Sequence, residues 1–479
     1  MSTELGGTGV MTLGGRPGFR RISTGNPQAD EILGGGFPAN SINIIMGQPG
    51  VGKTIFAEQL VFHNVAGDRP VLYLTTLSEP LPKVVRYLQG FRFFDERRLV
   101  FDEAAPGPVV LYEEVGDALA AEGIGALVQR VKEAIKTISP KIIVIDSFKA
   151  VHDLATSPLQ MRHMIYELAG LLTAYDTTAF LIGEYAEDAL QHYPEFVVAD
   201  AIVELVRYKL GMRDERYFRV LKLRGSGFRE GMHAFRITED GLQIYPRLVT
   251  PRSADLYDLE DERVTSGVPG LDGLLGGGVW RGSTTLVAGP VGSGKTTIGL
   301  QYALAGLAAG EPALYVHLQE NPTQVARLLR GFGADEKQAR AAGLHLLYAS
   351  PVELPIDSIV VETFRLIERT GVRRVIVDSV GDLAKAATDP ERLYDYVYAF
   401  SQHLAVRNIT TFLTYESAGD GLLLSGQTRI SSMSDNVLLL GIEVGPLTRR
   451  TIRVLKERAS AHDQHVHELA IASDGLRVL

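Results

Sequence analysis

Short apolar runs alternate with longer amphipathic stretches along most of this chain. The runs are rich in aliphatic residues and predict buried strands, while apolar positions at helical spacing predict helices that pack on them. Strands and helices that alternate in this way form a mainly parallel sheet flanked by helices, an α/β fold. The clearest predicted strands are 42–46, 71–75, 142–145, 285–288, 313–316 and 375–377, and the clearest predicted helices are 325–332 and 359–369.

The sequence contains an internal repeat. The segment 24–37, TGNPQADEILGGGF, returns as 266–279, SGVPGLDGLLGGGV. The offset is 267 − 25 = 242 for one glycine of the segment and 295 − 53 = 242 for a lysine further on, and a constant offset indicates tandem duplication. Residues 1–20 are rich in Gly, Thr and Ser without apolar periodicity. We therefore predict a flexible tail at 1–20, a first domain at 21–250, a linker at 251–262 and a second domain at 263–479.

Composition narrows the class of protein. The 479 residues are 45% hydrophobic and 22% charged, which is typical of ordinary globular domains, and the length suits two of them. The net charge of −9 argues against a chain whose main role is to wrap nucleic acid. Cysteine is absent, which excludes disulfides and thiolate chemistry. No long apolar stretch and no signal pattern occurs, so we expect a cytoplasmic protein with no membrane segment.

Each copy carries the pattern G-x-x-x-x-G-K-[ST] directly after a predicted strand. In such a P-loop the glycines let backbone N–H groups converge on phosphate oxygens, the lysine neutralises the β- and γ-phosphates, and the hydroxyl ligates Mg²⁺. A glycine turn that meets a lysine by chance is the alternative, and the repeat counts against it. We predict ATP binding, with catalytic roles for both lysines, at Gly47, Gln48, Pro49, Gly50, Val51, Gly52, Lys53 and Thr54 and at Gly289, Pro290, Val291, Gly292, Ser293, Gly294, Lys295 and Thr296.

An aspartate ends a second predicted strand in each copy. These residues are Asp146 and Asp378, at an offset of 378 − 146 = 232. A carboxylate at the end of a buried parallel strand is well placed to hold Mg²⁺ opposite the P-loop hydroxyl. We therefore predict two metal sites, Thr54 with Asp146 and Thr296 with Asp378. The alternative is an aspartate that only caps the next helix.

A glutamate follows the strand between P-loop and aspartate in each copy. Glu79 and Glu320 are candidate bases for the nucleophile that attacks the γ-phosphate. A solvated carboxylate at a strand end is the alternative. Phe91 and Phe332, at matching places in LQGF and LRGF, are candidates to stack on adenine, although such aromatic residues more often belong to the core.

Together these residues resemble the KaiC family, the circadian clock ATPases and autokinases, over roughly residues 20–479. The resemblance implies two RecA-like domains, ATP and Mg²⁺ as cofactors, and a homo-hexamer of two stacked rings with ATP at subunit interfaces. It also implies that a Lys-x-Arg element of one subunit reaches the γ-phosphate of its neighbour. The matching residues are Lys222, Arg224, Lys456 and Arg458, with Arg450 just upstream. Basic residues on a solvated strand face are the alternative.

The segment 428–436, TRISSMSDN, resembles the phospho-acceptor site of the family, with Ser431 and Ser432 as acceptors. The first copy reads EFVVAD there, without a hydroxyl, so the resemblance implies Ser/Thr autokinase activity in the second domain only. A polar turn capped by Asp435 is the alternative. The family usually has two adjacent glutamates after the strand, whereas this chain has Ser78-Glu79 and Gln319-Glu320.

The predicted function is therefore that of a hexameric KaiC-like signalling or clock-related ATPase. A KaiB-like or other signalling partner is possible, but KaiA is not expected because the chain stops at Leu479 without the long extension that KaiA engages. A RecA- or RadA-like DNA-dependent ATPase is one alternative, but the loop 420–426 lacks the Lys or Arg that DNA binding requires. A non-hydrolytic scaffold that assembles on ATP is another.

Overall fold

The computed structural model describes residues 20–65, 70–76, 81–101, 109–210, 213–251, 253–258, 260–350, 355–387, 390–417, 429–472 and 475–479. The chain divides into two compact units, residues 1–247 and 248–479. Within the predicted linker, the Tyr257 hydroxyl donates to Gln402 and the Glu260 amide donates to Asn408, so this part of 251–262 packs on the second unit. The predicted domain limits themselves stay a prediction.

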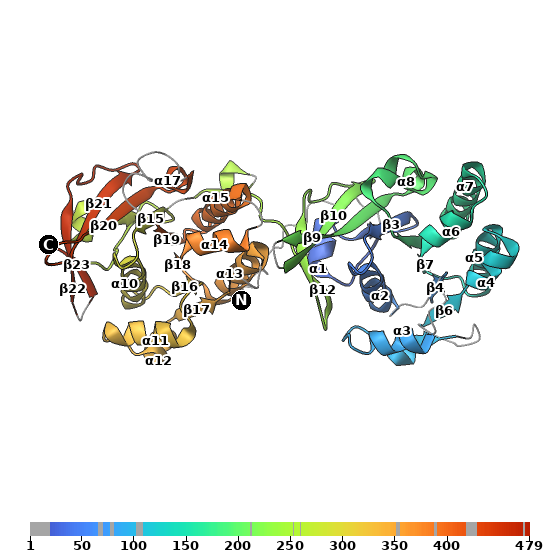
Figure 1. Ribbon diagram of the computed structural model, residues 1–479, viewed down its shortest axis with the longest axis horizontal. Coiled ribbons are helices and arrows are strands. Elements are labelled where there is room, and N and C mark those ends of the chain that lie inside the picture. Colours follow the sequence, from blue (N-terminus) through green and yellow to red (C-terminus); the bar gives the residue numbers. More distant parts are fainter. Residues whose placement is uncertain are drawn as a thin grey trace, which may run out of the picture. The chain divides into compact units, whose positions relative to one another are not determined.

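The first unit is built on a mixed sheet (Figure 1). Seven strands are parallel, and β10 to β12 continue the sheet as antiparallel strands beyond β9. In the described residues their spatial order is β12 (Gly241–Tyr245), β11 (His233–Thr238), β10 (Arg213–Leu223), β9 (Ala201–Leu210), β3 (Ile42–Gly47), β8 (Thr178–Gly183), β7 (Ile142–Asp146), β4 (Val71–Thr75), β6 (Val110–Glu114) and β5 (Leu99–Val100). The helices are α1 (Pro27–Ile32), α2 (Lys53–Asn64), α3 (Leu81–Leu88), α4 (Gly116–Glu122), α5 (Gly125–Thr137), α6 (Phe148–Leu154), α7 (Pro158–Ala174) and α8 (Pro194–Val198), with β1 (Arg21–Ile22) paired to β2 (Phe37–Pro38).

The second unit repeats this plan. Its strands in spatial order are β17 (Leu344–Tyr348), β16 (Ala313–His317), β18 (Arg374–Asp378), β19 (Thr410–Glu416), β15 (Thr284–Gly289), β20 (Asn436–Glu443), β21 (Arg449–Glu457), β22 (His467–Ala472) and β23 (Gly475–Val478), the last three antiparallel to their neighbours. The helices are α9 (Leu271–Leu274), α10 (Lys295–Ala308), α11 (Pro322–Gly331), α12 (Glu336–Ala341), α13 (Ile356–Thr370), α14 (Val380–Ala386), α15 (Pro390–Val406) and α17 (Arg429–Met433), with β13 (Arg263–Val264) paired to β14 (Val279–Trp280). The predicted α/β class with a mainly parallel sheet in each unit is confirmed.

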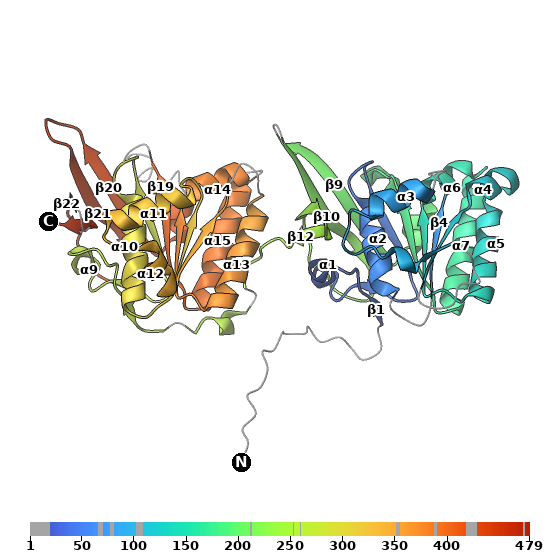
Figure 2. The same ribbon diagram turned by 90° about the horizontal axis from the view of Figure 1, so that it is seen from below.

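Helices cover both faces of each sheet and run alongside its strands (Figure 2). Successive residues of a buried strand point to opposite faces, so each strand supplies two cores. In β15, Val287 packs in the core under α10, and its neighbours Leu286 and Ala288 pack in the core under α13 to α15. This double burial explains why the strands read as continuous apolar runs. Among the described residues, no helix is both long and apolar enough to cross a bilayer.

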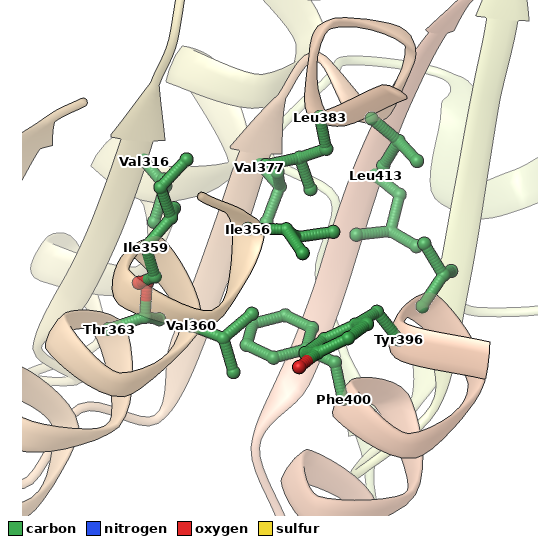
Figure 3. Close-up of a pocket in the computed structure, with 12 residues that line it drawn as sticks. Val316, Ile356, Ile359, Val360, Thr363, Val377, Leu383, Tyr396, Phe400 and Leu413 are labelled. Carbon is green, nitrogen blue, oxygen red and sulfur yellow. The ribbon is translucent and has the colours of Figure 1, made fainter. Parts of the chain in front are cut away.

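Figure 3 shows the core between α13, α15 and the second sheet. Val360, Tyr396 and Phe400 face the strand residues Val377 and Leu413 around a cavity of about 20 Å³. The lining is almost wholly apolar, so the cavity belongs to the packed core and offers no set of polar groups to a ligand.

A buried ionic network lies where β18 begins, in the sheet of the second unit. Arg374, the first residue of β18, has a side chain that is only 2% exposed, and its Nε donates to Glu311 at 2.6 Å. Its Nη1 donates to the carbonyls of Thr265 and Tyr302. Arg281, which is also buried, bonds to the same glutamate. In the first unit Ile142 begins the matching strand β7, so this network distinguishes the second unit.

We predict that Glu311→Ala strongly destabilises the second unit. Removing the shared carboxylate leaves the buried guanidinium of Arg374 without its anion, which costs about 3–5 kcal/mol, whereas Arg281 keeps its pair with Glu262. Trp280 is the sole tryptophan of the chain, so urea unfolding followed by its fluorescence measures the second unit selectively. The exposed Glu368 of α13, changed to alanine, is the control and should stay within about 0.5 kcal/mol of the parent. An equal midpoint for both variants would contradict the prediction.

Candidate nucleotide sites

The two P-loops connect the central strand of each sheet to a helix. β3 leads through the first loop into α2, and β15 leads through the second loop into α10, as the sequence predicts. The residue before each helix is a glycine in the left-handed region, Gly52 at φ 116° and Gly294 at φ 107°. The positive φ of Gly294 favours glycine, and a Cβ there would also lie 2.7 Å from a methyl group of Leu476, which would have to shift. Backbone N–H groups at such a helix start are suited to bind phosphate.

Both P-loop lysines lie against their own loops. Lys53 Nζ donates to the carbonyls of Gly47 at 3.0 Å and Gln48 at 2.9 Å. Lys295 Nζ donates to Gly289 at 2.9 Å and Pro290 at 2.8 Å. Burial lowers the pKa of both lysines, although nearby carboxylates oppose this shift. Each ammonium is therefore held where phosphate would be expected, by carbonyls that a phosphate oxygen could replace.

The two predicted metal pairs are brought together. Thr54 Oγ1 donates to Asp146 Oδ2 at 2.9 Å, and Thr296 Oγ1 donates to Asp378 Oδ2 at 2.7 Å. A hydroxyl beside a carboxylate is a hard oxygen donor set that fits Mg²⁺, which takes its other ligands from phosphates and water. Among the described residues no cluster of three or more His, Asp or Glu forms a protein-only metal cage. The pairs therefore fit a metal that arrives with a nucleotide.

A tyrosine that sequence reasoning missed supports each aspartate. Tyr73 donates to Asp146 Oδ2 at 2.9 Å, and Tyr315 donates to Asp378 Oδ2 at 2.7 Å. Both tyrosines are fully buried, and they stand at the repeat offset of 315 − 73 = 242. That constant offset was the available signal. Burial raises the pKa of Asp146, while its bonds from Thr54 and Tyr73 favour the ionised form.

The structure describes one of the two candidate bases. Glu79 lies outside the described residues. Glu320 lies just beyond β16, half-buried, and its pKa is raised by burial and by the nearby charge of Asp378. The offset of 242 that relates Tyr73 to Tyr315 aligns Ser78, rather than Glu79, with Glu320 in the repeat. The role of Glu79 as a base therefore stays a prediction with weaker support than that of Glu320.

Two further carboxylates near the lysines were also missed. Glu184, beyond β8, lies 3.8 Å from Lys53 Nζ, and Glu416, at the end of β19, is a charge near Lys295. They share the offset 416 − 184 = 232 of the metal-site aspartates, which could have singled them out. In the first unit Glu58 of α2 is fully buried, and burial raises its pKa well above the usual value.

The Lys-x-Arg cations contact the segment that leads into β9 in the first unit or into β20 in the second. Lys222 donates to the carbonyls of Phe196 and Val197 at the end of α8. Lys456 donates to the carbonyls of Ser431, Ser432 and Ser434 around the end of α17, the last at 2.6 Å. Arg224 and Arg458 likewise bond to Val197 and to Ser432, and they pair with Asp200 and Asp435. A β-bulge precedes the lysine in each copy, which aims it at these carbonyls.

The remaining predicted residues are Arg450, Phe91 and Phe332, together with the loop 420–426. Arg450 Nε donates to the carbonyl of Gly292, so this arginine contacts the P-loop of its own unit, and its trans role stays a prediction. Phe91 and Phe332 are partly buried and pack on the cores of their units, and Phe91 stacks on Phe93. Their contact with adenine also stays a prediction. The loop 420–426 lies outside the described residues.

Comparison with known proteins agrees with the duplicated plan. A family model of the KaiC ATPase matches residues 22–249 and 264–479. The chain belongs to the KaiC family. It is 28% identical over 477 residues to the circadian clock oscillator protein KaiC of a Picosynechococcus strain, covering 96% of this chain and 90% of that protein. It is also 28% identical to the circadian clock protein KaiC3 of a Synechocystis strain, covering 96% and 92%, and to KaiC of Rippkaea orientalis, covering 99% and 92%.

Membership of the KaiC family confirms the predicted tandem RecA-like domains. Both P-loops and both Thr–Asp pairs lie inside the matched ranges, so each domain carries the components of a nucleotide site. The two KaiC-type domains differ at several polar positions around that common site.

We predict that Tyr315→Phe raises the Mg²⁺ concentration needed for ATP binding at the second site. The phenol fixes Asp378, and losing a group that orients a metal ligand typically weakens metal affinity about 10- to 100-fold. Mg²⁺ titrations of nucleotide binding in the Lys53→Ala background measure this change. Tyr302→Phe is the matched control, because Tyr302 is equally buried but donates to the carbonyl of Thr410. Equal Mg²⁺ dependence for both variants would refute a supporting role.

Proposed function

We propose that this KaiC-family protein is a cytoplasmic, Mg²⁺-dependent ATPase that forms a hexamer and phosphorylates Ser431 and Ser432 between subunits of its second domain. The single observation that carries the proposal is the position of these serines relative to the P-loop of their own unit. That position follows from the register of β15 and β20.

The acceptor segment lies at the end of the sheet opposite its own P-loop. Parallel pairing sets Asn436 of β20 beside Thr285, near the start of β15, and Asp435 accepts from the amide of Thr284. The P-loop begins at Gly289, 289 − 285 = 4 residues further along the strand, a rise of about 13 Å. This separation between the entry to β20 and the P-loop argues against transfer to Ser431 or Ser432 of the same unit. We therefore propose that the phosphate comes from ATP on a second subunit.

The Lys-x-Arg cations share this location. Lys456 pairs with Val437 of β20, which itself pairs with Leu286, so it lies on the acceptor side of the sheet. In the first unit Lys222 pairs with Ile202, which pairs with Ile44 of β3. Cations set apart from the P-loop of their own unit along the strand are suited to complete the site of a neighbour, as arginine fingers do. Hydrolysis would then depend on assembly.

Within one site, the chain supplies the groups that phosphoryl transfer needs. Lys295 and the amides of the P-loop would hold the phosphates, and Thr296 with Asp378 would hold Mg²⁺, which offsets the phosphate charge. Glu320, whose raised pKa makes it a better base than a free carboxylate, would accept the proton of the nucleophile. The first unit has the same phosphate and metal groups but lacks a hydroxyl at the acceptor position, so we assign it hydrolysis alone.

The names of the relatives point to a cellular role. The compared proteins are called circadian clock proteins, and for this chain we propose a signalling or clock-related ATPase with a KaiB-like or other signalling partner. We do not expect DNA as a partner. ATP turnover measured with and without single-stranded DNA tests the last point, since a DNA-dependent motor would be stimulated.

We predict that ATP promotes hexamers and that the double change Lys222→Ala with Arg224→Ala weakens them. The reason is that a trans cation binds its neighbour only through the γ-phosphate. Light scattering with an ATP analogue and without nucleotide gives the mass in each case. Arg162→Ala on the exposed side of α7 serves as the control. A monomer under both conditions would remove the shared sites from the proposal.

We predict that Lys295→Ala abolishes phosphorylation of the 428–436 peptide, whereas Lys53→Ala chiefly lowers assembly and basal hydrolysis. The second P-loop alone belongs to the ring that carries the serines. Incubation with Mg²⁺ and ATP followed by phosphopeptide mass spectrometry measures the modification in preformed hexamers. An unmodified peptide in a parent preparation that hydrolyses ATP would support the polar-turn alternative and leave only the ATPase.

A further inference from the structure

Gln319 stands directly before Glu320, in place of the first of the two glutamates expected from the family. Its side chain is exposed just beyond β16, and its Nε2 donates to Asp382 Oδ2 at 2.8 Å. Asp382, on α14, is only 2% exposed and also accepts from Ser379 Oγ at 2.6 Å. An exposed amide is thus tied to a buried carboxylate at the edge of the second nucleotide site.

This hydrogen bond fixes which way the amide faces. Because Gln319 donates through Nε2 to Asp382, its oxygen Oε1 is turned away from this carboxyl group. Without this partner, the amide could rotate and present either a donor or an acceptor to solvent. An amide oxygen accepts a hydrogen bond from water but is too weak a base to remove a proton. Gln319 can therefore orient a nucleophile while another group deprotonates it.

We propose that Asp382 is a positioning residue that holds Gln319 so that the amide oxygen orients the water attacking the γ-phosphate of ATP in the second domain. The inference rests on the proposed ATPase function of that domain. The water oxygen forms a bond to the γ-phosphorus, the bond from phosphorus to the β–γ bridging oxygen breaks, and ADP leaves. Glu320 receives the proton of the water.

The hydrogen bond between Gln319 and Asp382 distinguishes the two domains. The helices α6 and α14 match at an offset of 380 − 148 = 232, which places Ala150 where Asp382 stands. Alanine has no acceptor for a side-chain amide. The first domain cannot build this pair, so the inference concerns hydrolysis at the second site and predicts no effect on the first.

The test uses the full-length hexamer and steady-state ATP turnover. The share of turnover that Lys295→Ala removes defines the contribution of the second site. We expect Gln319→Ala and Asp382→Asn each to lower kcat of this share about tenfold or more, with KM nearly unchanged, because water orientation acts in the transition state. In combination the two changes should be no slower than Gln319→Ala alone. Asp395→Asn, an exposed aspartate of α15, is the control and should retain full turnover.

A rescue experiment separates positioning from general support of the fold. Gln319→Glu alone places two carboxylates together and should be slow, whereas Gln319→Glu combined with Asp382→Asn restores the hydrogen bond with its polarity reversed. We expect the pair to recover most of the lost kcat. Trp280 fluorescence melts verify that each variant is folded.

Four results would overturn the inference. Full turnover in Asp382→Asn, or a further loss when this change is added to Gln319→Ala, would show that Asp382 does not act through Gln319. A slow Gln319→Glu, Asp382→Asn pair would do the same. Turnover undiminished by Lys295→Ala would instead overturn hydrolysis at the second site, and with it both the proposed function of that site and this inference.

Discussion

The direction of the central strand in each sheet decides where all of the chemistry lies. β3 and β15 have parallel neighbours on both sides, so all of these strands end at the same edge. The P-loop lies at that edge, together with the aspartate of the Thr–Asp pair and the residues after β4 or β16. The lysines of the Lys-x-Arg elements contact the segments that enter β9 and β20 at the opposite edge. A strand that is buried on both faces cannot slip its register without exposing its apolar residues, so the separation of the two edges is fixed.

The two copies share the groups that would touch phosphate or metal and differ in the buried polar groups behind them. Arg374 with Glu311 in the second unit corresponds to an isoleucine that begins β7 in the first. The first unit has a fully buried glutamate, Glu58, where Leu300 packs in the second. Each polar substitution in such an interior needs its own partners or shifts its protonation, so the copies can be tuned separately without any change in the P-loops.

The sequence predicts the parts of the site that depend on local spacing. The P-loops follow from contiguous motifs, and the Thr–Asp pairs follow from strand ends in a parallel sheet. The support from Tyr315 and the bond from Gln319 to Asp382 were not predicted, because each joins residues 63 positions apart whose meeting depends on strand register and rotamer. The carbonyl partners of Lys456 were missed for the same reason, since the β-bulge that aims the lysine leaves no composition signal.

The second unit contains two classes of cation that differ in how readily they could change partners. Arg374 is enclosed with a carboxylate and backbone carbonyls, and moving it would leave charges uncompensated in the core. Arg458 is 55% exposed, and its 3.2 Å pair with Asp435 is a surface pair of the kind that contributes little. A γ-phosphate carries more charge than either a carbonyl or a single carboxylate and would compete well for such a cation. The exposed Arg458 is therefore a cation whose present pair a phosphate could displace, whereas the buried Arg374 holds the sheet to which it is attached.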